Sequence, residues 1–400
     1  MTSHAANRRR FLQFLAASPL LRTAAPLSAL LAANALEGAE ILDDSNYYAE
    51  AAQWAVNVFD MERVARRNLS QAHWTYIAQG VDDDFTVQAN SAAYRKIHLR
   101  PRRLVNVTEV SKGIELFGER MDSPLILAPV GGLAMAHPGG EVEAARGAKV
   151  TGHQMIHSNA ASFKLDDVVA ARGAPVWIQL YANFDWKVSL ERIKLAQTLG
   201  AKAIFLTVDI PARNQERMRR FDRASPECTA CHRPPAVSGP PRLDSPPSAS
   251  AMLDWDYVKR LQDSTSMKVV IKGITHPLDA ALCLEHGVDG ILVSNHGGRA
   301  DESGLGTIQL LPDIVNVVQK RIPVLVDGGI RRGTDILKAM ALGASAVCIG
   351  RPYVWGVGAF GQEGVSRVLQ ILDAELDVAL RQAGLTDIGK AAADMVKVDA

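Results

Sequence analysis

Residues 323–351 read PVLVDGGIRRGTDILKAMALGASAVCIGR, and they contain one complete repeat of the fold. Two apolar runs, 323–326 and 346–349, flank a segment in which apolar residues recur at helical spacing, 332–342. Each run is apolar at almost every position rather than at alternate positions, which is typical of a parallel strand buried on both faces. The stretch therefore predicts a strand–helix–strand unit.

The same alternation extends back to Pro124. Eight short apolar runs are found, namely Leu125–Val130, Gln154–His157, Val176–Leu180, Ala203–Val208, Val269–Lys272, Gly290–Val293, Pro323–Val326 and Ala346–Ile349. Amphipathic segments lie between them, including Trp186–Leu199, Pro277–His286, Leu311–Arg321 and Arg332–Leu342. Eight such units predict an α/β protein with a (β/α)8 TIM barrel over residues 124–400. A doubly wound sheet is the structural alternative, but the unbroken rhythm favours a closed barrel.

Two segments lie outside this rhythm. Residues 36–123 predict a connector and an N-terminal helical cover, with a helix over Met61–Ala78. A long Pro/Ser/Gly-rich insert between Asp209 and Trp255 follows the fourth strand. Because this loop leaves the C-terminal end of a strand, we expect it to lie over the mouth where barrel enzymes place their sites.

Composition indicates a globular protein, with 48% hydrophobic and 22% charged residues. The 44 Lys and Arg residues balance 43 Asp and Glu residues, which excludes an overall basic protein that coats nucleic acid. No segment is predicted to span a membrane, since Arg22 and two prolines interrupt the apolar N-terminal run.

The first 35 residues are predicted to be an export signal. They contain four arginines and no acidic residue, and the run Arg8-Arg9-Arg10-Phe11-Leu12 resembles a twin-arginine signal. Ala33-Asn34-Ala35 offers a small-x-small cleavage site. The prediction is therefore a periplasmic protein exported in the folded state with its cofactor bound; a flexible amphipathic arm is the alternative.

Four cysteines are too few for a disulfide scaffold. Cys283 and Cys348 lie in apolar runs and are predicted to be buried. Cys228-Thr-Ala-Cys231-His232 spells the attachment pattern of a c-type haem, but the surrounding insert lacks helices that could bury one. A disulfide or free thiols are therefore favoured over haem, and no metal site is predicted.

Polar residues follow the predicted strands at their C-terminal ends. Glycine turns with Arg331 and Arg351 follow strands seven and eight, where barrel proteins often bind phosphate; capping glycines with solvated arginines are the alternative. Lys272 within a buried strand would be costly unless it faced an anion. His296 is a natural general base, Asp209 could stabilise its protonated form, and a guanidinium three residues later suits a carboxylate.

From about Trp54 to the C-terminus, the chain resembles the FMN-dependent L-2-hydroxy acid dehydrogenases and oxidases, which include the glycolate, lactate and mandelate enzymes. The most specific match is the run SNHGGR at 294–299. It is supported by VDGGIRRGTD at 326–335, IGRP at 349–352, APVG at 128–131, MAHP at 135–138 and QLY at 179–181.

The resemblance implies FMN as cofactor and a small 2-hydroxy acid as substrate, with a homo-oligomeric assembly. His296 would be the base, Asp209 would hold its imidazolium, and Lys272 would stabilise the reduced flavin. The substrate carboxylate would bind Arg299 and Tyr76, and its hydroxyl Tyr181. The implied contacts of the flavin are Ala128, Pro129, Val130, Ser158, Gln179, Thr207, Lys272 and Ser294, and those of the ribityl phosphate are Asp327, Gly329, Arg331, Gly350 and Arg351.

Three positions depart from the family pattern. The run Arg213-Asn214-Gln215-Glu216-Arg217 places Gln215 where the family has an arginine for the carboxylate, so Arg213 or Arg217 substitutes, or Arg299 and Tyr76 act alone. Ala160 replaces a bulky aromatic residue and would admit an acid larger than the default, lactate. Gly131 stands where oxidases tend to carry alanine, which favours a quinone or cytochrome as acceptor. The alternatives are an oxidase that converts O2 to H2O2, and a non-catalytic flavin or haem electron-transfer module.

Overall fold

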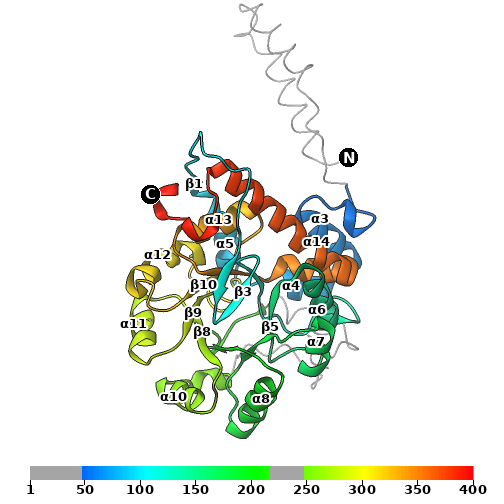
Figure 1. Cartoon of the computed structure of the whole chain (residues 1–400). Helices are drawn as coiled ribbons and strands as arrows, with labels where there is room; N and C mark the ends of the chain where they lie inside the picture. The colour runs from blue at the N-terminus through cyan, green and yellow to red at the C-terminus, as the bar shows by residue number, and fades with distance from the viewer. Residues whose placement is uncertain (1–46, 217–246, 400) are drawn as a thin grey trace, which may run out of the picture. The chain divides into compact units, whose positions relative to one another are not determined.

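The computed structural model describes residues 47–216 and 247–399. Eight parallel strands close into a barrel in the order β10-β11-β4-β5-β6-β7-β8-β9, which confirms the predicted fold (Figure 1). The strands are β4 (Leu125–Leu127), β5 (Gln154–His157), β6 (Trp177–Leu180), β7 (Ala203–Thr207), β8 (Lys268–Ile274), β9 (Gly290–Val293), β10 (Val324–Asp327) and β11 (Ala346–Ile349). Each of the eight apolar runs thus contains a strand, and nearly all strand residues are buried.

Strand β8 extends beyond the predicted run and carries a bulge between Lys272 and Ile274. Gly273 within the bulge has φ +112°, and a Cβ there would lie 2.6 Å from the Cβ of Asp209. Glycine is therefore required by both conformation and space. It lets the end of β8 approach the loop after β7, and so brings Lys272 beside Asp209.

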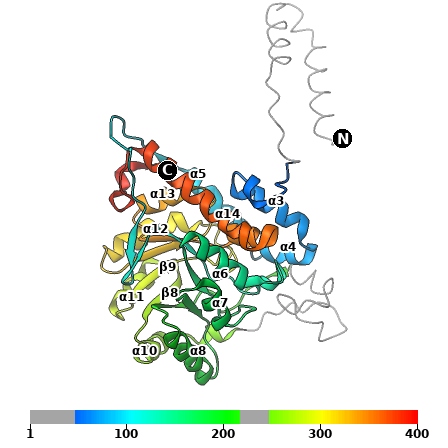
Figure 2. The same ribbon diagram turned by 45° about the vertical axis from the view of Figure 1, so that its right-hand side comes forward.

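Helices surround the barrel (Figures 1 and 2). They are α6 (Gly140–Thr151), α7 (Leu165–Arg172), α8 (Trp186–Thr198), α10 (Trp255–Asp263), α11 (Pro277–Glu285), α12 (Thr307–Val318), α13 (Gly333–Ala341) and α14 (Arg351–Ala383), with short 3-10 turns at Ala52–Trp54, Leu133–Met135, Ala249–Met252, Ile388–Lys390 and Ala393–Met395. Helix α14 bends at Phe360–Gly361. Across the described residues, no helix combines the length and apolar character needed to cross a bilayer.

The single helix predicted over 61–78 is wrong, because the chain forms α3 (Val58–Asn68) and α4 (Gln71–Ala78) there. Leu69 is extended, and the Ser70 side chain accepts a hydrogen bond from the His73 backbone N–H at 3.3 Å. Serine competes for the backbone in this way and favours a new helix start over continuation. The break turns α4 so that its C-terminal end reaches the barrel mouth.

The N-terminal cover, described over 47–123, contacts both ends of the barrel. Helix α5 (Phe85–Arg95) leads to β1 (Ile97–Leu99), which pairs antiparallel with β12 (Val396–Val398). The hairpin β2 (Ile114–Leu116) and β3 (Glu119–Met121) places the Phe117 ring edge-on to Trp177, with ring centres 5.3 Å apart. Because Trp177 begins β6, this contact covers the N-terminal end of the barrel, opposite the rim at which the strands end.

Candidate active site

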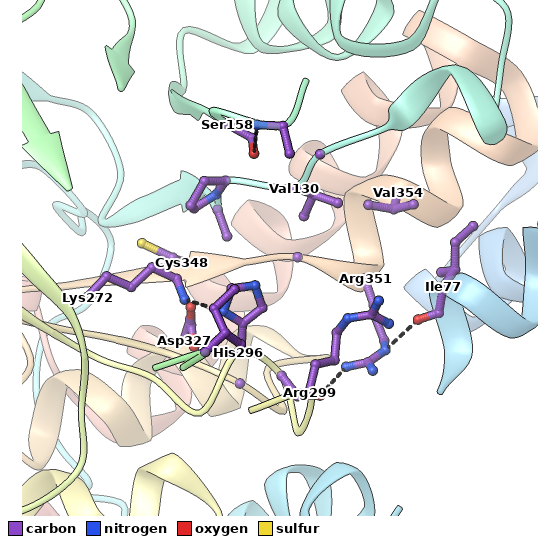
Figure 3. Close-up of a pocket in the computed structure, with 18 of the residues that line it drawn as sticks. Ile77, Val130, Ser158, Lys272, His296, Arg299, Asp327, Cys348, Arg351 and Val354 are labelled. Atoms are coloured by element: carbon purple, nitrogen blue, oxygen red, sulfur yellow. Dashed lines mark hydrogen bonds between the residues drawn. The ribbon is translucent and has the colours of Figure 1, made fainter. Parts of the chain in front are cut away.

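A cavity of about 300 Å³ lies at the C-terminal end of the barrel (Figure 3). Most of the residues predicted for the site line it, namely Tyr76, Ala128, Pro129, Val130, Ser158, Tyr181, Lys272, His296, Arg299, Asp327, Gly329, Arg331, Gly350 and Arg351. Two of the three departing positions, Gly131 and Ala160, also line the cavity; Gln215 does not, but Arg213 two residues before it does. The structure therefore brings together residues from the C-terminal ends of all eight strands and from α4 of the cover.

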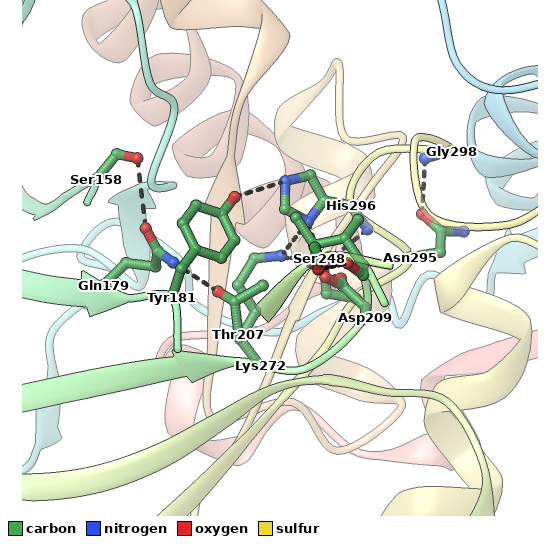
Figure 4. Close-up of polar contacts among 12 residues, drawn as sticks. Ser158, Gln179, Tyr181, Thr207, Asp209, Ser248, Lys272, Asn295, His296 and Gly298 are labelled. Carbon is green, nitrogen blue, oxygen red and sulfur yellow. Dashed lines mark hydrogen bonds and ion pairs between the residues drawn. The ribbon is translucent and has the colours of Figure 1, made fainter. Parts of the chain in front are cut away.

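Four predicted site residues do not line the cavity: Asp209, which belongs to the polar cluster described below, and three residues behind the lining. Gln179, Thr207 and Ser294 are each at most 1% exposed and do not line the cavity. The Gln179 amide accepts a hydrogen bond from the Ser158 hydroxyl (3.3 Å) and donates one to the Thr207 hydroxyl (3.0 Å; Figure 4). In this structure they hold lining residues in place rather than present their own surface.

Four polar groups form one connected cluster beside the cavity (Figure 4). His296 Nδ1 lies 2.9 Å from Asp209 Oδ1, and the Lys272 ammonium lies 3.3 Å from Asp209 Oδ2 and 3.2 Å from His296 Nδ1. The Tyr181 hydroxyl lies 3.3 Å from the other imidazole nitrogen, Nε2. Since an ionised carboxylate only accepts, Nδ1 donates to Asp209, and Nε2 is left as the basic atom.

The protonation states of this cluster suit proton abstraction. Burial, and then the charge of Lys272, lower the pKa of His296 to about 4. Burial would raise the pKa of Asp209, but Lys272 and His296 outweigh it and lower that pKa to about 2. Burial would lower the pKa of Lys272, but Asp209 raises it above its ordinary value. At neutral pH the site therefore holds a neutral imidazole between a carboxylate and an ammonium group.

The backbone at His296 is held in an unusual conformation. His296 has φ +58°, and Gly297 and Gly298 follow in the same left-handed region. A histidine there is uncommon, so the surrounding contacts must maintain it. One of these is the Ser294 hydroxyl, which accepts from the His296 N–H at 3.1 Å and from the Lys272 ammonium at 3.0 Å.

We predict that kcat/KM for a reducing substrate is flat from pH 8 to about 5 and falls below about pH 4. His296 can accept a proton only as the neutral imidazole. The pH dependence of kcat/KM reports the pKa of His296 in the free protein, which burial and Lys272 lower to about 4. Stopped-flow reduction of the bound flavin after pH jumps measures this profile. Full recovery on return to pH 7 excludes acid unfolding, and a limb near the ordinary histidine pKa would contradict the assignment.

Three arginines, Arg299, Arg331 and Arg351, line the cavity, and Figure 3 shows the guanidinium groups of Arg299 and Arg351 close together. Arg351 donates to the backbone carbonyls of Ile77 (2.9 Å) and Gly297 (2.7 Å), and Arg299 donates to that of Gln79 (3.0 Å). Burial, and then repulsion from Arg299 and Arg331, lower the pKa of Arg351 to about 9. A bound anion would relieve this repulsion, so the cluster is suited to a phosphate and a carboxylate.

These residues fit a flavin mononucleotide. Asp327 Oδ1 is buried beside the cavity and has no hydrogen-bond partner among the described residues, so it can accept from a ribityl hydroxyl. A Cβ at Gly350 would meet nothing closer than 3.8 Å, which leaves room for a phosphate between the turn and Arg351. The apolar Ala128–Val130 segment offers a surface for a flat ring.

Two parts of the site could not be found from motifs. Ser248, Ala249 and Ser250, near the C-terminal end of the long insert, line the cavity, and the Ser248 hydroxyl donates to Ile210 O at 2.6 Å. This bond joins the two ends of the insert over the cavity. Arg192 donates to Ser158 O (2.9 Å) and to His157 Nδ1 (3.1 Å) from behind the lining. Neither contact has a signal in the sequence, because each joins segments far apart along the chain.

The fold and the site together define a class, a (β/α)8 barrel enzyme with an imidazole–carboxylate base beside an anion cradle. The chain matches the FMN-dependent dehydrogenase family over residues 65–398, and it belongs to that family. This confirms the resemblance predicted from the SNHGGR and VDGGIRRGTD runs, and with it FMN as the cofactor.

Individual relatives agree with this family. The chain is similar to a 2-hydroxyacid oxidase of Dictyostelium discoideum (38% identical, 83% of this chain and 88% of that protein). It is also similar to an L-lactate oxidase of Nostoc sp. (37% identical, 83% and 95%). Among solved structures, mandelate oxidase matches with a TM-score of 0.78 (36% identical, 86% and 98%), and a variant of flavocytochrome b2 with 0.77 (30% identical, 86% and 87%).

Proposed function

We propose that this protein oxidises an L-2-hydroxy acid to the corresponding 2-oxo acid with FMN and passes the electrons to a quinone or cytochrome. The observation that carries the proposal is the neutral His296 imidazole, held by Asp209 and lining the same cavity as three arginines. A base and a carboxylate-binding group in one cavity are what this oxidation requires.

FMN, when bound, would take up the two electrons and one of the two protons that leave the substrate. The chain supplies the remaining functions. Arg299 and Tyr76 hold the carboxylate, and the Tyr181 hydroxyl orients the substrate hydroxyl at His296. His296 Nε2 accepts the proton that is released, and Asp209, 2.9 Å from Nδ1, stabilises the resulting imidazolium.

We further propose that Arg213 takes the carboxylate-binding place of the arginine that the family pattern leads us to expect near Gln215. Arg213 lines the cavity and acts electrostatically on His296, Tyr181 and Arg299. Gln215 is 4% exposed and outside the lining, and its amide nitrogen has no partner among the described residues. Arg217 lies outside the described residues.

Arg213→Met is expected to raise the KM for the acid about 10- to 100-fold, because a charge-assisted hydrogen bond to the carboxylate is lost. Arg217→Met is the matched control and is expected to change KM less than twofold. Steady-state kinetics with one saturating acceptor measures both. A larger effect at Arg217 than at Arg213 would reverse the assignment.

Two small residues shape the wall of the cavity nearest β4 and β5. A Cβ at Gly131 would lie 2.6 Å from the Ala160 carbonyl oxygen and 2.8 Å from its Cβ, so the two loops touch there. The short Ala160 side chain supports a substrate larger than lactate. Glycine at position 131 is therefore explained by packing against Ala160 as well as by the type of electron acceptor. Because the residue alone does not distinguish a dehydrogenase from an oxidase, the rate of flavin reoxidation by O2 must do so.

Anaerobic reduction of the bound flavin by L-lactate, L-mandelate and longer L-2-hydroxy acids tests the proposal. We expect bleaching with at least one of them, faster for the bulky acids, and slow reoxidation after air is admitted. No bleaching with any acid would contradict the activity and leave a non-catalytic electron carrier. Fast reoxidation with release of peroxide would instead indicate an oxidase.

Export, haem and assembly stay predictions. The proposed twin-arginine signal over residues 1–35 and the Cys228-Thr-Ala-Cys231-His232 run lie outside the described residues. We propose a periplasmic location on the sequence pattern alone, and a homo-oligomeric state on the resemblance to the family alone.

A further inference from the structure

Helix α5 of the N-terminal cover buries polar side chains against the site loops. Its buried residues are Thr86, Asn90, Ala93 and Tyr94, which recur at helical spacing on one face. A buried face that carries Thr86 and Asn90 is unusual for a helix whose role is only to cover a barrel. The Thr86 hydroxyl accepts from the Gly304 N–H at 2.9 Å, in the loop that follows β9.

Asn90 forms a reciprocal amide pair with Asn295, the residue before His296. Asn90 Nδ2 donates to Asn295 Oδ1 at 2.9 Å, and Asn295 Nδ2 donates to Asn90 Oδ1 at 3.0 Å. Both residues are only 2% exposed. Asn295 Oδ1 also accepts from the Gly298 N–H (3.0 Å), and its Nδ2 donates to Leu305 O (3.1 Å). The Asn295 amide thus uses both donors and both lone pairs, so its orientation is fixed.

The Asn90–Asn295 pair supports the strained backbone on both sides of His296, the proposed base. Asn295 precedes His296, with φ +58°, and its side chain binds the backbone of Gly298 on the other side. Without Asn90, the Asn295 amide would lose one donor and one acceptor partner inside the protein. The left-handed turn at His296–Gly298 would then lose part of the support that maintains it.

Asn90 also packs against the glycine turn that follows β10. A Cβ at Gly329 would lie 1.9 Å from the Asn90 carbonyl oxygen, and one at Gly328 would lie 2.9 Å from its Oδ1. The same Oδ1 accepts from the Thr307 N–H at 3.1 Å. The Asn90 side chain thus binds the loop that carries the base and, through Oδ1, lies against Gly328 of the turn that leads to Arg331, whereas the approach to Gly329 is made by the Asn90 backbone.

We infer that Asn90 is a positioning residue that couples the N-terminal cover to both halves of the site, the base His296 and the phosphate turn Asp327–Arg331. It does not line the cavity and acts through Asn295 and the glycines. The part concerning His296 rests on the proposed function. The part concerning the phosphate turn is independent of the proposed function, because it predicts a change in FMN affinity that can be measured without any catalytic reaction.

Asn90→Ala is expected to raise the FMN dissociation constant about tenfold or more and to slow flavin reduction at saturating acid by a similar factor, with KM changed less than twofold. Fluorescence quenching of FMN titrated into the deflavinated protein measures the first quantity, and stopped-flow reduction the second. Asn68→Ala is the matched control: Asn68 donates from the same cover to Gly358 O and Ala359 O, both at 3.1 Å, away from the cavity. It is expected to lower Tm without changing either quantity more than twofold.

A double-mutant cycle with Asn295→Ala completes the test. If the pair acts as a unit, the double variant is expected to reduce flavin no more slowly than Asn295→Ala alone. Should Asn90→Ala fail to fold, Asn90→Asp at pH 8 keeps the size and the acceptor for Thr307 but cannot donate to Asn295, and the same losses are expected. Wild-type-like FMN affinity and reduction in a folded Asn90 variant would overturn the inference. If no acid reduces the flavin of the wild-type protein, the proposed function is rejected. The predicted change in FMN affinity is then tested by the fluorescence titration alone.

Discussion

His296→Ala is expected to slow reduction of the bound flavin by about 10²–10⁴-fold while FMN remains bound. His296 Nε2 is the basic atom that faces the cavity, and its pKa of about 4 keeps it neutral and ready to accept a proton at neutral pH. Removal leaves Asp209 and Lys272 paired, so the buried charges stay compensated. Stopped-flow absorbance with the fastest acid measures the loss, and the visible flavin spectrum reports retention of the cofactor.

Two further variants separate chemistry from folding. His296→Asn tolerates the left-handed backbone better than alanine, so an equal loss in both variants excludes backbone strain as the cause. His276→Ala is the matched histidine control, because that side chain caps α11 outside the cavity and should affect Tm alone. Near-normal reduction in both His296 variants would remove the base from the proposed mechanism.

The barrel could be predicted because its strands are buried on both faces. Such strands read as continuous apolar runs, and three of them, at 154–157, 290–293 and 346–349, have the predicted bounds. The break between α3 and α4 was missed because it depends on one serine that caps a helix in place of continuing it. Periodicity alone does not report that competition.

The catalytic cluster could be predicted for a different reason. Parallel strands of a closed barrel end at one rim, so Asp209, Lys272 and His296 had to converge once they were assigned to strand ends. Contacts that depend on the cover could not be obtained this way. Asn90 and Asn295 are 205 residues apart in the chain, and no rule of spacing relates a helix of the cover to one particular loop.

The arginine for the substrate carboxylate shows the same limit. Gln215, Arg213 and Arg217 lie within five residues, and the pattern left open which of them faces the substrate. The path of the loop decides, and that path is set by distant contacts. Asn214 bonds to Asp82 in the cover, and Ser248 binds Ile210 from the far end of the insert.

Lys272→Met is expected to slow flavin reduction at pH 8 by about 10²–10³-fold and to move the acid limb of kcat/KM upward from about pH 4. The rate falls because a buried ammonium no longer stabilises negative charge developing in the cavity. The limb moves because Lys272 lowers the pKa of His296, so its removal lets that pKa rise toward its ordinary value. The two effects have one cause and should appear together in one pH–rate profile.

Lys268→Met is the matched control for this prediction. Lys268 lies on the same strand and pairs with Asp289 at 2.8 Å, but its side chain is 52% exposed. Loss of an exposed ion pair costs at most about 1 kcal/mol of stability and changes no group at the cavity.

Lys272 is 3% exposed at the side chain, and its loss leaves the buried Asp209 carboxylate with His296 as its remaining partner. Asp209 then favours protonation of His296 against burial and Arg213 but no longer against Lys272, so the pKa of His296 rises and the base becomes an imidazolium at a higher pH than in the wild-type protein. If Lys272→Met slows flavin reduction but the acid limb of the kcat/KM profile stays near pH 4, Lys272 acts on the flavin alone. Asp209 and burial would then set the pKa of His296 without a contribution from Lys272.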